Sequence, residues 1–313
     1  MSFDLLVILG PTASGKTRLG VDLARRLSGE IVSADSRQVY RGMDIGTGKD
    51  LAEYGEVPHH LIDIAEPGDE FNVFQFQRRF FEAFAAIRER GRLPILVGGT
   101  GMYLEAVLKG YHLVEVPDNP ALRAELAPLP MEELTDRLKR TAPRLHNTTD
   151  LLDRERMVRA IEIAAYEQRH EPKPLPEVEP LVLGVRWERG VLRERITARL
   201  KERLGQGLVE EVAGLHAAGI PWEAFEFYGL EYRYVARFLK GELTRNDMVQ
   251  KLNSAIHDFA KRQETWFRRM ERSGTTIHWL DGAGEPLAEA LEIVSGRGLP
   301  PISPPCPRSP AST

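Results

Sequence analysis

Residues 5–17 read LLVILGPTASGKT, and this stretch decides the fold because it joins an apolar run, a glycine-rich turn and a helix start. Leu5–Gly10 shows no alternation of apolar and polar residues, which is typical of a strand covered on both faces of a parallel sheet. Gly10–Thr17 fits the G-x-x-x-x-G-K-[ST] pattern of a phosphate-binding loop. Lys16–Leu27 then places leucines along one helical face. The stretch therefore predicts a strand, a phosphate loop and a helix in succession.

The predicted phosphate loop consists of Gly10, Pro11, Thr12, Ala13, Ser14, Gly15, Lys16 and Thr17. Its glycines allow the backbone to turn so that successive N–H groups point at phosphate oxygens, beside the positive end of the helix dipole. Lys16 supplies a point charge to the terminal phosphate, and the Thr17 hydroxyl can ligate Mg²⁺, the expected cofactor. The loop predicts a bound phosphate ester and leaves open whether ATP also occupies it.

Strands and helices alternate along the first third of the chain. Further strands are expected at Glu30–Ala34, His60–Ile64 and Leu93–Val97, with helices over Phe74–Arg90 and Met102–Leu108. Alternation of this kind is typical of parallel βαβ units. The expected fold class is therefore α/β: a P-loop NTPase-like parallel sheet flanked by helices, with a mostly helical inserted domain.

The inserted domain is predicted from a change in sequence character. Asn119–Gln168 is charged and helical in pattern, and His170–Pro180 is a proline-rich connector. Returning strands are expected at Leu181–Trp187 and Thr275–Leu280, and helical patterns cover Val191–Ala218 and Asn246–Glu271. The expected division is a core of residues 1–112 and 181–295, a helical insertion of residues 113–180, and a disordered proline-rich tail of residues 296–313.

Composition excludes several classes of protein. The 313 residues are 42% hydrophobic and 28% charged, as in ordinary globular proteins. No apolar run reaches the roughly 18 residues that span a bilayer, and the first residues show no export signal. The single cysteine, Cys306, allows no internal disulfide. We expect a cytoplasmic monomer that is not associated with a membrane.

The charge distribution is ambiguous without other evidence. The formal net charge of −4 argues against nucleic-acid binding. However, Arg186–Arg203 has seven basic and three acidic residues, and Lys261–Arg272 has five basic and two acidic residues. These stretches are either solvated helix faces or contacts to phosphate, and the solvated face is the default interpretation.

Asp35 follows the second predicted strand and is the main candidate for chemistry. Residues just beyond the carboxyl end of a parallel strand face the ligand crevice. A carboxylate there can bind Mg²⁺ through water or act as a general base, whereas a structural role as a cap of the next turn is equally compatible with the sequence. The nearby Gln38 has an amide suited to the edge of an adenine.

In combination, six sequence blocks resemble the tRNA dimethylallyltransferase (isopentenyl-tRNA transferase) family. The blocks are GPTASGKT (10–17), SADSRQVYRGMDIGTGK (33–49), VPHHLIDI (57–64), PILVGGTGMYLEAVLKG (94–110), GLVEEV (207–212) and AKRQETWFRR (260–269). The resemblance implies transfer of a dimethylallyl group from dimethylallyl pyrophosphate to the exocyclic N6 amine of the adenosine adjacent to the anticodon, with release of pyrophosphate. The implied partners are tRNA and dimethylallyl pyrophosphate.

The resemblance also implies roles for individual residues. Asp35 is implied as the base, Lys16 and Thr100 as further catalytic residues, and Arg195 as a pyrophosphate ligand beside the loop. The implied tRNA contacts are Asp35, Ser36, Arg37, Gln38, Thr100, Arg123, Arg154, Arg156, Arg159, Arg233, Lys261, Arg262 and Gln263. Two blocks depart from the usual family pattern, at FYGLEYR (227–233) and at RLHNTTD (144–150).

Three other functions compete with this one. A P-loop kinase of a small metabolite would carry an acid at the end of a second buried strand, yet Leu93–Val97 ends in Gly-Gly-Thr-Gly, which leaves Asp63 as a weaker candidate. A prenyltransferase of free adenine nucleotides is disfavoured by the long helical segment and the basic helices. An RNA-binding regulator with an inactive loop is disfavoured because Lys16, Thr17 and Asp35 are all present.

Overall fold

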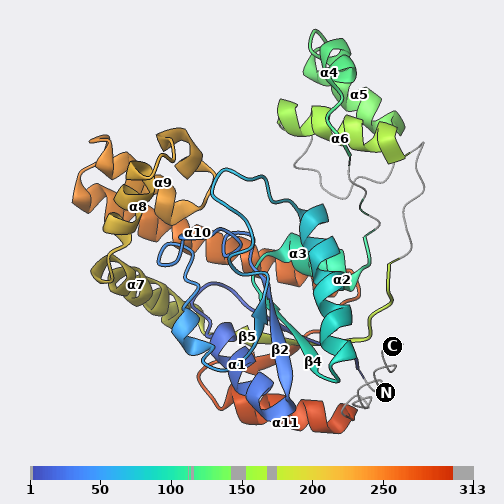
Figure 1. The fold of residues 1–313 in the computed structure, drawn as a ribbon, viewed down its shortest axis with the longest axis vertical. Coiled ribbons are helices and arrows are strands. Elements are labelled where there is room, and N and C mark those ends of the chain that lie inside the picture. Colours follow the sequence, from blue (N-terminus) through green and yellow to red (C-terminus); the bar gives the residue numbers. More distant parts are fainter. Residues whose placement is uncertain (1–2, 112, 114–115, 142–152, 168–174, 299–313) are drawn as a thin grey trace, which may run out of the picture. The chain divides into compact units, whose positions relative to one another are not determined.

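The computed structural model describes residues 3–111, 113, 116–141, 153–167 and 175–298 (Figure 1). The chain divides into two compact units: Met1–Lys109 with Glu177–Thr313, and Gly110–Pro176. These boundaries lie close to the sequence-based ones at 113 and 180. Among the described residues, no helix is long and apolar enough to cross a membrane.

The first unit contains a six-stranded sheet in which every strand pair is parallel. The strands are β1 (Leu5–Leu9), β2 (Gly29–Ala34), β3 (His59–His60), β4 (Leu93–Gly98), β5 (Pro180–Arg186) and β6 (His278–Asp281), in the order β3-β2-β4-β1-β5-β6. Helices flank the sheet, so the predicted α/β, P-loop-like class is confirmed. Leu9 and Ala34 both pair with Gly98. The loops that follow β1, β2 and β4 therefore start at one level of the same edge.

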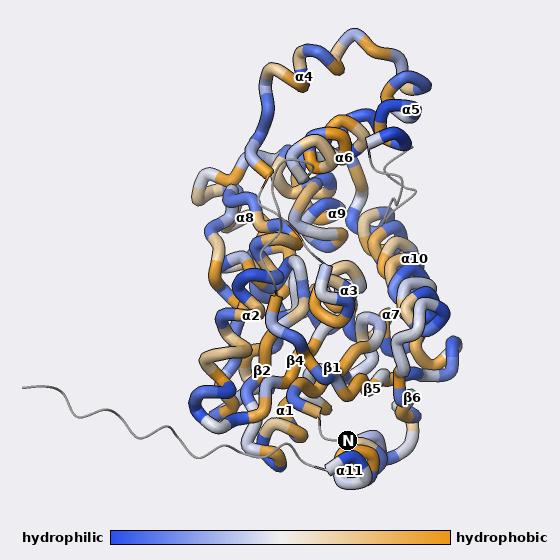
Figure 2. The backbone as a smooth tube through the Cα atoms, turned by 90° about the vertical axis from the view of Figure 1, so that its right-hand side faces the viewer, coloured by the Kyte–Doolittle hydropathy of each residue, from blue (hydrophilic) through white to orange (hydrophobic). Residues whose placement is uncertain are grey.

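Eight helices of the described residues belong to this unit. They are α1 (Lys16–Leu27), α2 (Val73–Glu89), α3 (Gly101–Leu108), α7 (Arg189–Gly205), α8 (Leu208–Ala217), α9 (Leu230–Leu239), α10 (Arg245–Arg272) and α11 (Pro286–Arg297). Two short 3₁₀ turns cover Leu51–Glu53 and Trp222–Glu226. Figure 2 shows the apolar character of the strands at the centre of this arrangement. One core cluster joins α1 and α11 to one face of the sheet, including Leu6, Ile8 and Leu183.

A second core cluster joins α7, α8, α9 and α10 to the loop after β2. The loop contributes Val39, Tyr40 and Met43, and the helices contribute residues such as Leu200 and Tyr232. Glu211 of α8 fastens the same loop, because its carboxylate accepts hydrogen bonds from three successive N–H groups, Asp44 to Gly46, at 2.7–2.9 Å. The C-terminal helices thereby fix the shape of the loop that begins at Asp35.

The second unit contains α4 (Pro120–Leu126), α5 (Met131–Thr141) and α6 (Arg154–Glu167). Its small core consists of Leu126, Leu134, Leu138, Met157 and Ile161. Asn119 caps α4 by accepting a hydrogen bond from the Leu122 N–H at 3.0 Å. The helical character predicted for this segment is present in its described residues.

Several predicted boundaries were wrong. β3 ends at His60 rather than Ile64, because Leu61 and Asp63 adopt positive φ and leave the extended conformation. The helical pattern over Val191–Ala218 is broken at Gly207, which has a φ of 104°. α9 and α11 were missed, and α11 includes residues 296 and 297 of the segment predicted as a disordered tail. Residues 299–313 of that tail lie outside the described residues.

Lys49 is the internal support of the loop after β2, and its replacement by methionine should destabilise the protein. Its side chain is fully buried, and its ammonium donates to the Tyr40 carbonyl and the Asp44 carboxylate at 2.7 Å and also pairs with Asp63. We expect Lys49→Met to lower the free energy of unfolding by about 2 kcal/mol, because it leaves the carbonyl of the buried Tyr40 unpaired and takes the cation from the partly exposed carboxylates of Asp44 and Asp63. Urea unfolding measures this, with the exposed Lys251→Met as the control; equal stability of the two variants would contradict it.

Candidate active site

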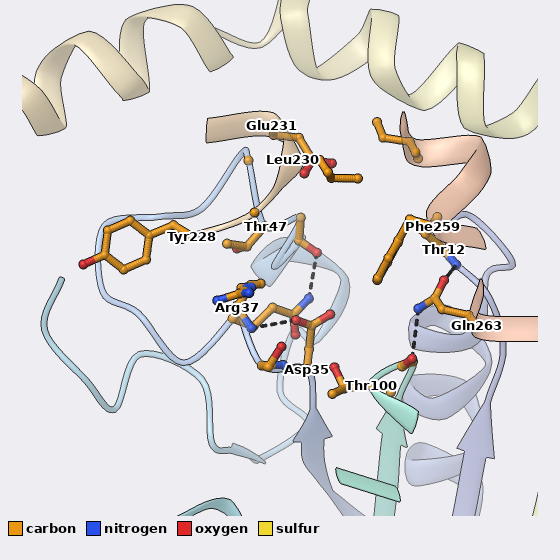
Figure 3. Close-up of a pocket in the computed structure, with 18 of the residues that line it drawn as sticks. Thr12, Asp35, Arg37, Thr47, Thr100, Tyr228, Leu230, Glu231, Phe259 and Gln263 are labelled. Atoms are coloured by element: carbon orange, nitrogen blue, oxygen red, sulfur yellow. Dashed lines mark hydrogen bonds between the residues drawn. The ribbon is translucent and has the colours of Figure 1, made fainter. Parts of the chain in front are cut away.

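A cavity of about 540 Å³ lies at the carboxyl edge of the sheet (Figure 3). The phosphate loop forms one side, the loops after β2 and β4 form the floor, and α7, α9 and α10 close the remaining sides. Its lining includes Thr12, Lys16, Thr17, Asp35, Ser36, Arg37, Thr100, Arg199, Arg203, Phe227, Glu231, Arg233, Phe259, Arg262, Gln263 and Trp266. The structure thus brings the predicted phosphate loop and the predicted base into one cavity.

The phosphate loop has the backbone conformation of an anion-binding turn. Ala13 and Gly15 have positive φ values of 62° and 88°, and the Ser14 N–H donates back to the Pro11 carbonyl at 3.2 Å. Among the described residues, the N–H groups of Gly15, Lys16 and Thr17 donate to no protein acceptor. These groups lie at the start of α1, where the helix dipole favours an anion. The loop can therefore bind phosphate oxygens without losing internal hydrogen bonds of those three groups.

Two side chains that follow β5 in the chain support the phosphate loop by donating hydrogen bonds to its carbonyls. Arg195 donates from Nε to the Ala13 carbonyl at 2.9 Å, and Trp187 donates from Nε1 to the Ser14 carbonyl at 2.9 Å. The Arg195 guanidinium also lies 4.0 Å from the centre of the Trp187 ring, a cation–π contact. Arg195 lies beside the loop, but it is absent from the residues that line the cavity. The structure assigns it to support of the loop, and pyrophosphate binding by Arg195 stays a prediction.

Arg199 and Arg203 were not predicted as site residues, although they line the cavity one and two helical turns beyond Arg195. This i, i+4, i+8 spacing was present in the basic stretch of the sequence, and it places the three side chains on one face of α7. Arg199 pairs with Asp50, and the buried Arg203 pairs with Glu231 at 3.2 Å. Burial and the neighbouring Arg199 lower the pKa of Arg203. The loop side of the cavity therefore contains a cluster of cations, of which Arg199 and Arg203 are paired with carboxylates.

Lys16 is half-buried beside these arginines. Its Nζ donates to the Pro11 carbonyl at 3.3 Å. Burial, followed by repulsion from Arg199, lowers the pKa of Lys16 to about 8, although the Asp35 carboxylate acts in the opposite direction. A bound diphosphate would bring the anionic partner that this charge lacks. In the ligand-free protein, the pKa of Lys16 therefore lies close to neutral pH.

The position of this pKa predicts a pH dependence of anion binding. Above about pH 8 the ligand-free Lys16 loses its proton, so the affinity for inorganic pyrophosphate should fall between pH 7 and pH 9. Isothermal titration calorimetry measures this fall, and the same titration of Lys16→Met corrects for the ionisation of pyrophosphate itself. Parallel pH profiles of the wild type and the variant would contradict the assignment.

The geometry of Asp35 shows the turn-capping role and leaves one carboxylate oxygen for the second role that the sequence left open. Its Oδ1 accepts a hydrogen bond from the Arg37 N–H at 2.8 Å, which forms the turn after β2. Its Oδ2 has no hydrogen-bond partner among the described residues and is available to a ligand. Figure 3 shows the carboxylate facing the cavity next to Thr100, whose Oγ1 accepts from the Ser36 N–H at 3.2 Å. The turn thus orients a carboxylate that can take up a proton.

Gln38 and Gln263 use their amides inside the protein, and contact of either side chain with tRNA stays a prediction. Gln38 accepts from the Ser33 hydroxyl at 2.9 Å and donates to the Gly48 carbonyl at 3.0 Å. Gln263 accepts from the Thr12 N–H at 2.8 Å and donates to the Gly99 carbonyl at 2.9 Å. Both side chains are buried, although both belong to the cavity lining, and their hydrogen bonds fix the amides in place.

Other predicted tRNA contacts surround the cavity. Arg37 lies 4.9 Å from the ring centre of Phe227, and Arg262 lies 5.8 Å from that of Phe259. Both phenylalanines are exposed, at 53% and 38%, so each pair offers an aromatic face and a cation to a nucleotide. Arg233 lines the cavity too, paired with Glu226 at 2.7 Å. Lys261 is exposed on α10 and is not part of the lining.

Three of the four arginines predicted to contact tRNA from the helical unit are bound within that unit. Arg123 forms a bidentate ion pair with the buried Glu162 at 2.8 and 2.9 Å. Arg154 donates to the carbonyls of Leu126, Ala127 and Leu129 at and just after the end of α4, and Arg159 donates to the Val116 carbonyl at 2.7 Å. Arg156 is exposed and has no side-chain partner among the described residues. Residues 144–150 lie outside the described residues.

The donors present fit a magnesium ion that is bound mainly through phosphate. Thr17 and Asp35 offer hard oxygen donors to the same cavity, as Mg²⁺ requires. Within the described part of the chain, no group of three or more His, Cys, Asp or Glu residues is placed to hold a metal. Asp63 pairs with Lys49, and His60 with Glu30 at 2.7 Å, so neither supplies a metal site. Phosphate oxygens and water would have to provide most ligands of such an ion.

The fold and the cavity define a P-loop-like α/β protein with an anion site opposite a carboxylate. The chain belongs to the IPP transferase family, which matches residues 38–270, and the Isopentenyl transferase family matches residues 3–57. A relative named tRNA dimethylallyltransferase 1, from Geotalea uraniireducens, is 71% identical over 300 residues, 96% of this chain and 100% of the relative. The family resemblance in the sequence is thereby confirmed.

Solved structures agree with this assignment. The tRNA isopentenylpyrophosphate transferase of Bacillus halodurans is 34% identical, with a TM-score of 0.70 over 95% of this chain and 97% of its own. A eukaryotic dimethylallyltransferase acting on tRNA has a TM-score of 0.78 over 95% of this chain and 81% of its own, and its 22% identity shows the shared fold.

Proposed function

We propose that the protein transfers a dimethylallyl group from dimethylallyl pyrophosphate to the N6 amine of the adenosine adjacent to the anticodon of tRNA. The observation that carries the proposal is the single cavity that contains both the phosphate loop and the free oxygen of Asp35. Curated relatives with 55–71% identity are named tRNA dimethylallyltransferases. A tRNA substrate supports action in the cytoplasm.

The reaction places the leaving group and the acceptor on opposite sides of the cavity. The diphosphate accepts hydrogen bonds from the N–H groups of Gly15 to Thr17, and Lys16 neutralises charge that grows as the C1–O bond breaks. When bound, a magnesium ion at Thr17 would add to this neutralisation. The N6 lone pair forms the new bond to C1, the N6 proton passes to Asp35, and pyrophosphate leaves with the electrons of the broken bond.

The adenine must leave its stack before its amine can reach Asp35. The exposed pairs Arg37–Phe227 and Arg262–Phe259 at the cavity support this step, because aromatic faces and guanidinium groups both stack on bases. The amine is a weak nucleophile, so its alignment with the allylic carbon contributes at least as much as the base. The site therefore needs a fixed separation between the phosphate loop and the two turns, after β2 and after β4, that carry Asp35 and Thr100.

A transfer assay tests the proposed function. Purified protein, Mg²⁺ and radiolabelled dimethylallyl pyrophosphate are incubated with unmodified tRNA or with AMP, and label in RNA and in nucleotide is counted separately. Prenylated tRNA without prenylated AMP is the expected result. Label in AMP alone would indicate a prenyltransferase of free nucleotides, and phosphoryl transfer from ATP to a small acceptor would indicate the kinase.

A further inference from the structure

Gln263 of α10 connects the two halves of the site through its side-chain amide (Figure 3). Its Oε1 accepts from the N–H of Thr12 in the phosphate loop at 2.8 Å, and its Nε2 donates to the carbonyl of Gly99 at 2.9 Å. Only 7% of its surface is exposed. Gly99 directly precedes Thr100 in the turn after β4, so one amide joins the leaving-group side of the cavity to the acceptor side.

The packing around this amide leaves it little freedom. A Cβ at Gly99 would lie 2.4 Å from Nε2 of Gln263, so the glycine is required for the close approach. One helical turn later in α10, Trp266 packs against Gly101 at the start of α3, where a Cβ would lie 2.3 Å from its ring. Both bonds of Gln263 therefore act over a short, filled gap between α10 and the loops after β1 and β4.

We propose that Gln263 is a positioning residue that sets the separation between the phosphate loop and the Gly99–Thr100 turn. The proposal rests on the proposed function, because that separation decides how the N6 amine lies in line with the allylic carbon. An amide is suited to this task because its two ends accept and donate at the same time. A misplacement of about 1 Å can cost about 10²-fold in rate.

Two variants separate the two hydrogen bonds. Gln263→Ala removes both, whereas Gln263→Glu keeps an acceptor for the Thr12 N–H and loses the donor to the Gly99 carbonyl. We expect kcat to fall about 10²-fold in the alanine variant and at least about tenfold in the glutamate variant. The KM for tRNA should change little in both variants, and the affinity for inorganic pyrophosphate should change little in the alanine variant, which adds no charge beside the phosphate loop. Gln250→Ala, at an exposed glutamine of the same helix, is the matched control.

Four outcomes would contradict the positioning role of Gln263. A raised KM for tRNA with unchanged kcat would make Gln263 a tRNA contact, as the sequence suggested. A weakened affinity of the alanine variant for pyrophosphate would make Gln263 part of the phosphate site alone. Full activity of Gln263→Glu would show that the bond to Gly99 has no role, and a large loss of thermal stability in both variants would assign Gln263 to folding.

Hydrogen exchange provides a readout that needs no turnover. In Gln263→Ala the Thr12 amide should exchange faster than in the wild type, whereas Gln263→Glu should keep its protection. The Thr100 amide, which donates to the Ala34 carbonyl at 3.3 Å, should exchange faster in both variants. If the wild type fails to prenylate tRNA, the proposed function fails, and these exchange rates still decide whether Gln263 fixes both loops.

Discussion

Replacing Asp35 with asparagine should lower the rate of prenyl transfer about 10³-fold, within the range of about 10² to 10⁴ for loss of a general base. Asparagine keeps the oxygen that accepts from the Arg37 N–H at 2.8 Å, so the turn after β2 should persist. It loses the charge and the proton-accepting capacity of Oδ2. Single-turnover transfer to tRNA measures the rate, and calorimetry with pyrophosphate should show an intact phosphate site.

A matched control for this substitution is Asp69→Asn. Asp69 is an exposed aspartate outside the cavity lining that also accepts a backbone N–H, from Glu66 at 3.0 Å. It tests whether an asparagine in a similar turn has any general effect. If Asp35→Asn turned over at the wild-type rate, Asp35 would be a turn residue only, and proton removal would have to be assigned to another group.

The parts of the fold that the sequence predicted are those built from local pattern. α1 begins at Lys16 and ends at Leu27 as expected, because the phosphate loop fixes its start and Ser28 ends it in a left-handed conformation. β1 and β4 were evident from uninterrupted apolar residues that are buried on both faces. The position of Asp35 was also predictable from local pattern. Asp35 directly follows the end of β2, and residues after the carboxyl end of a parallel strand face the ligand crevice.

The residues that the sequence could not place act across long separations. Gln263 and Thr12 are 251 positions apart, and Glu211 binds N–H groups that are 165 to 167 positions away. In a helix, a glutamine or glutamate with such a role has the same local pattern as a solvated residue. Lys49 was hidden in the same way, because nothing local distinguishes a buried lysine from an exposed one. Only the tertiary contacts show which of them support the site.

Lys16→Met should weaken pyrophosphate binding about 100-fold and lower the rate of transfer by about 10² to 10³, since it removes the cation that faces the leaving group. Methionine has a similar length, so the cavity should keep its shape. Calorimetry and single-turnover kinetics measure the two losses. Lys16→Arg keeps a charge, and it should retain more pyrophosphate affinity than methionine does.

The ligand-free stability of Lys16→Met should change in the opposite direction to its affinity. Burial and Arg199 lower the pKa of Lys16 to about 8, so at neutral pH the folded protein holds this charge less favourably than the unfolded chain does. Removing the charge should leave the melting temperature unchanged or raise it. If Lys16 only supported the loop, its replacement would lower both the melting temperature and the affinity for pyrophosphate. Loss of binding without loss of stability therefore identifies Lys16 as a ligand of the diphosphate, whereas a large fall in melting temperature would contradict this role.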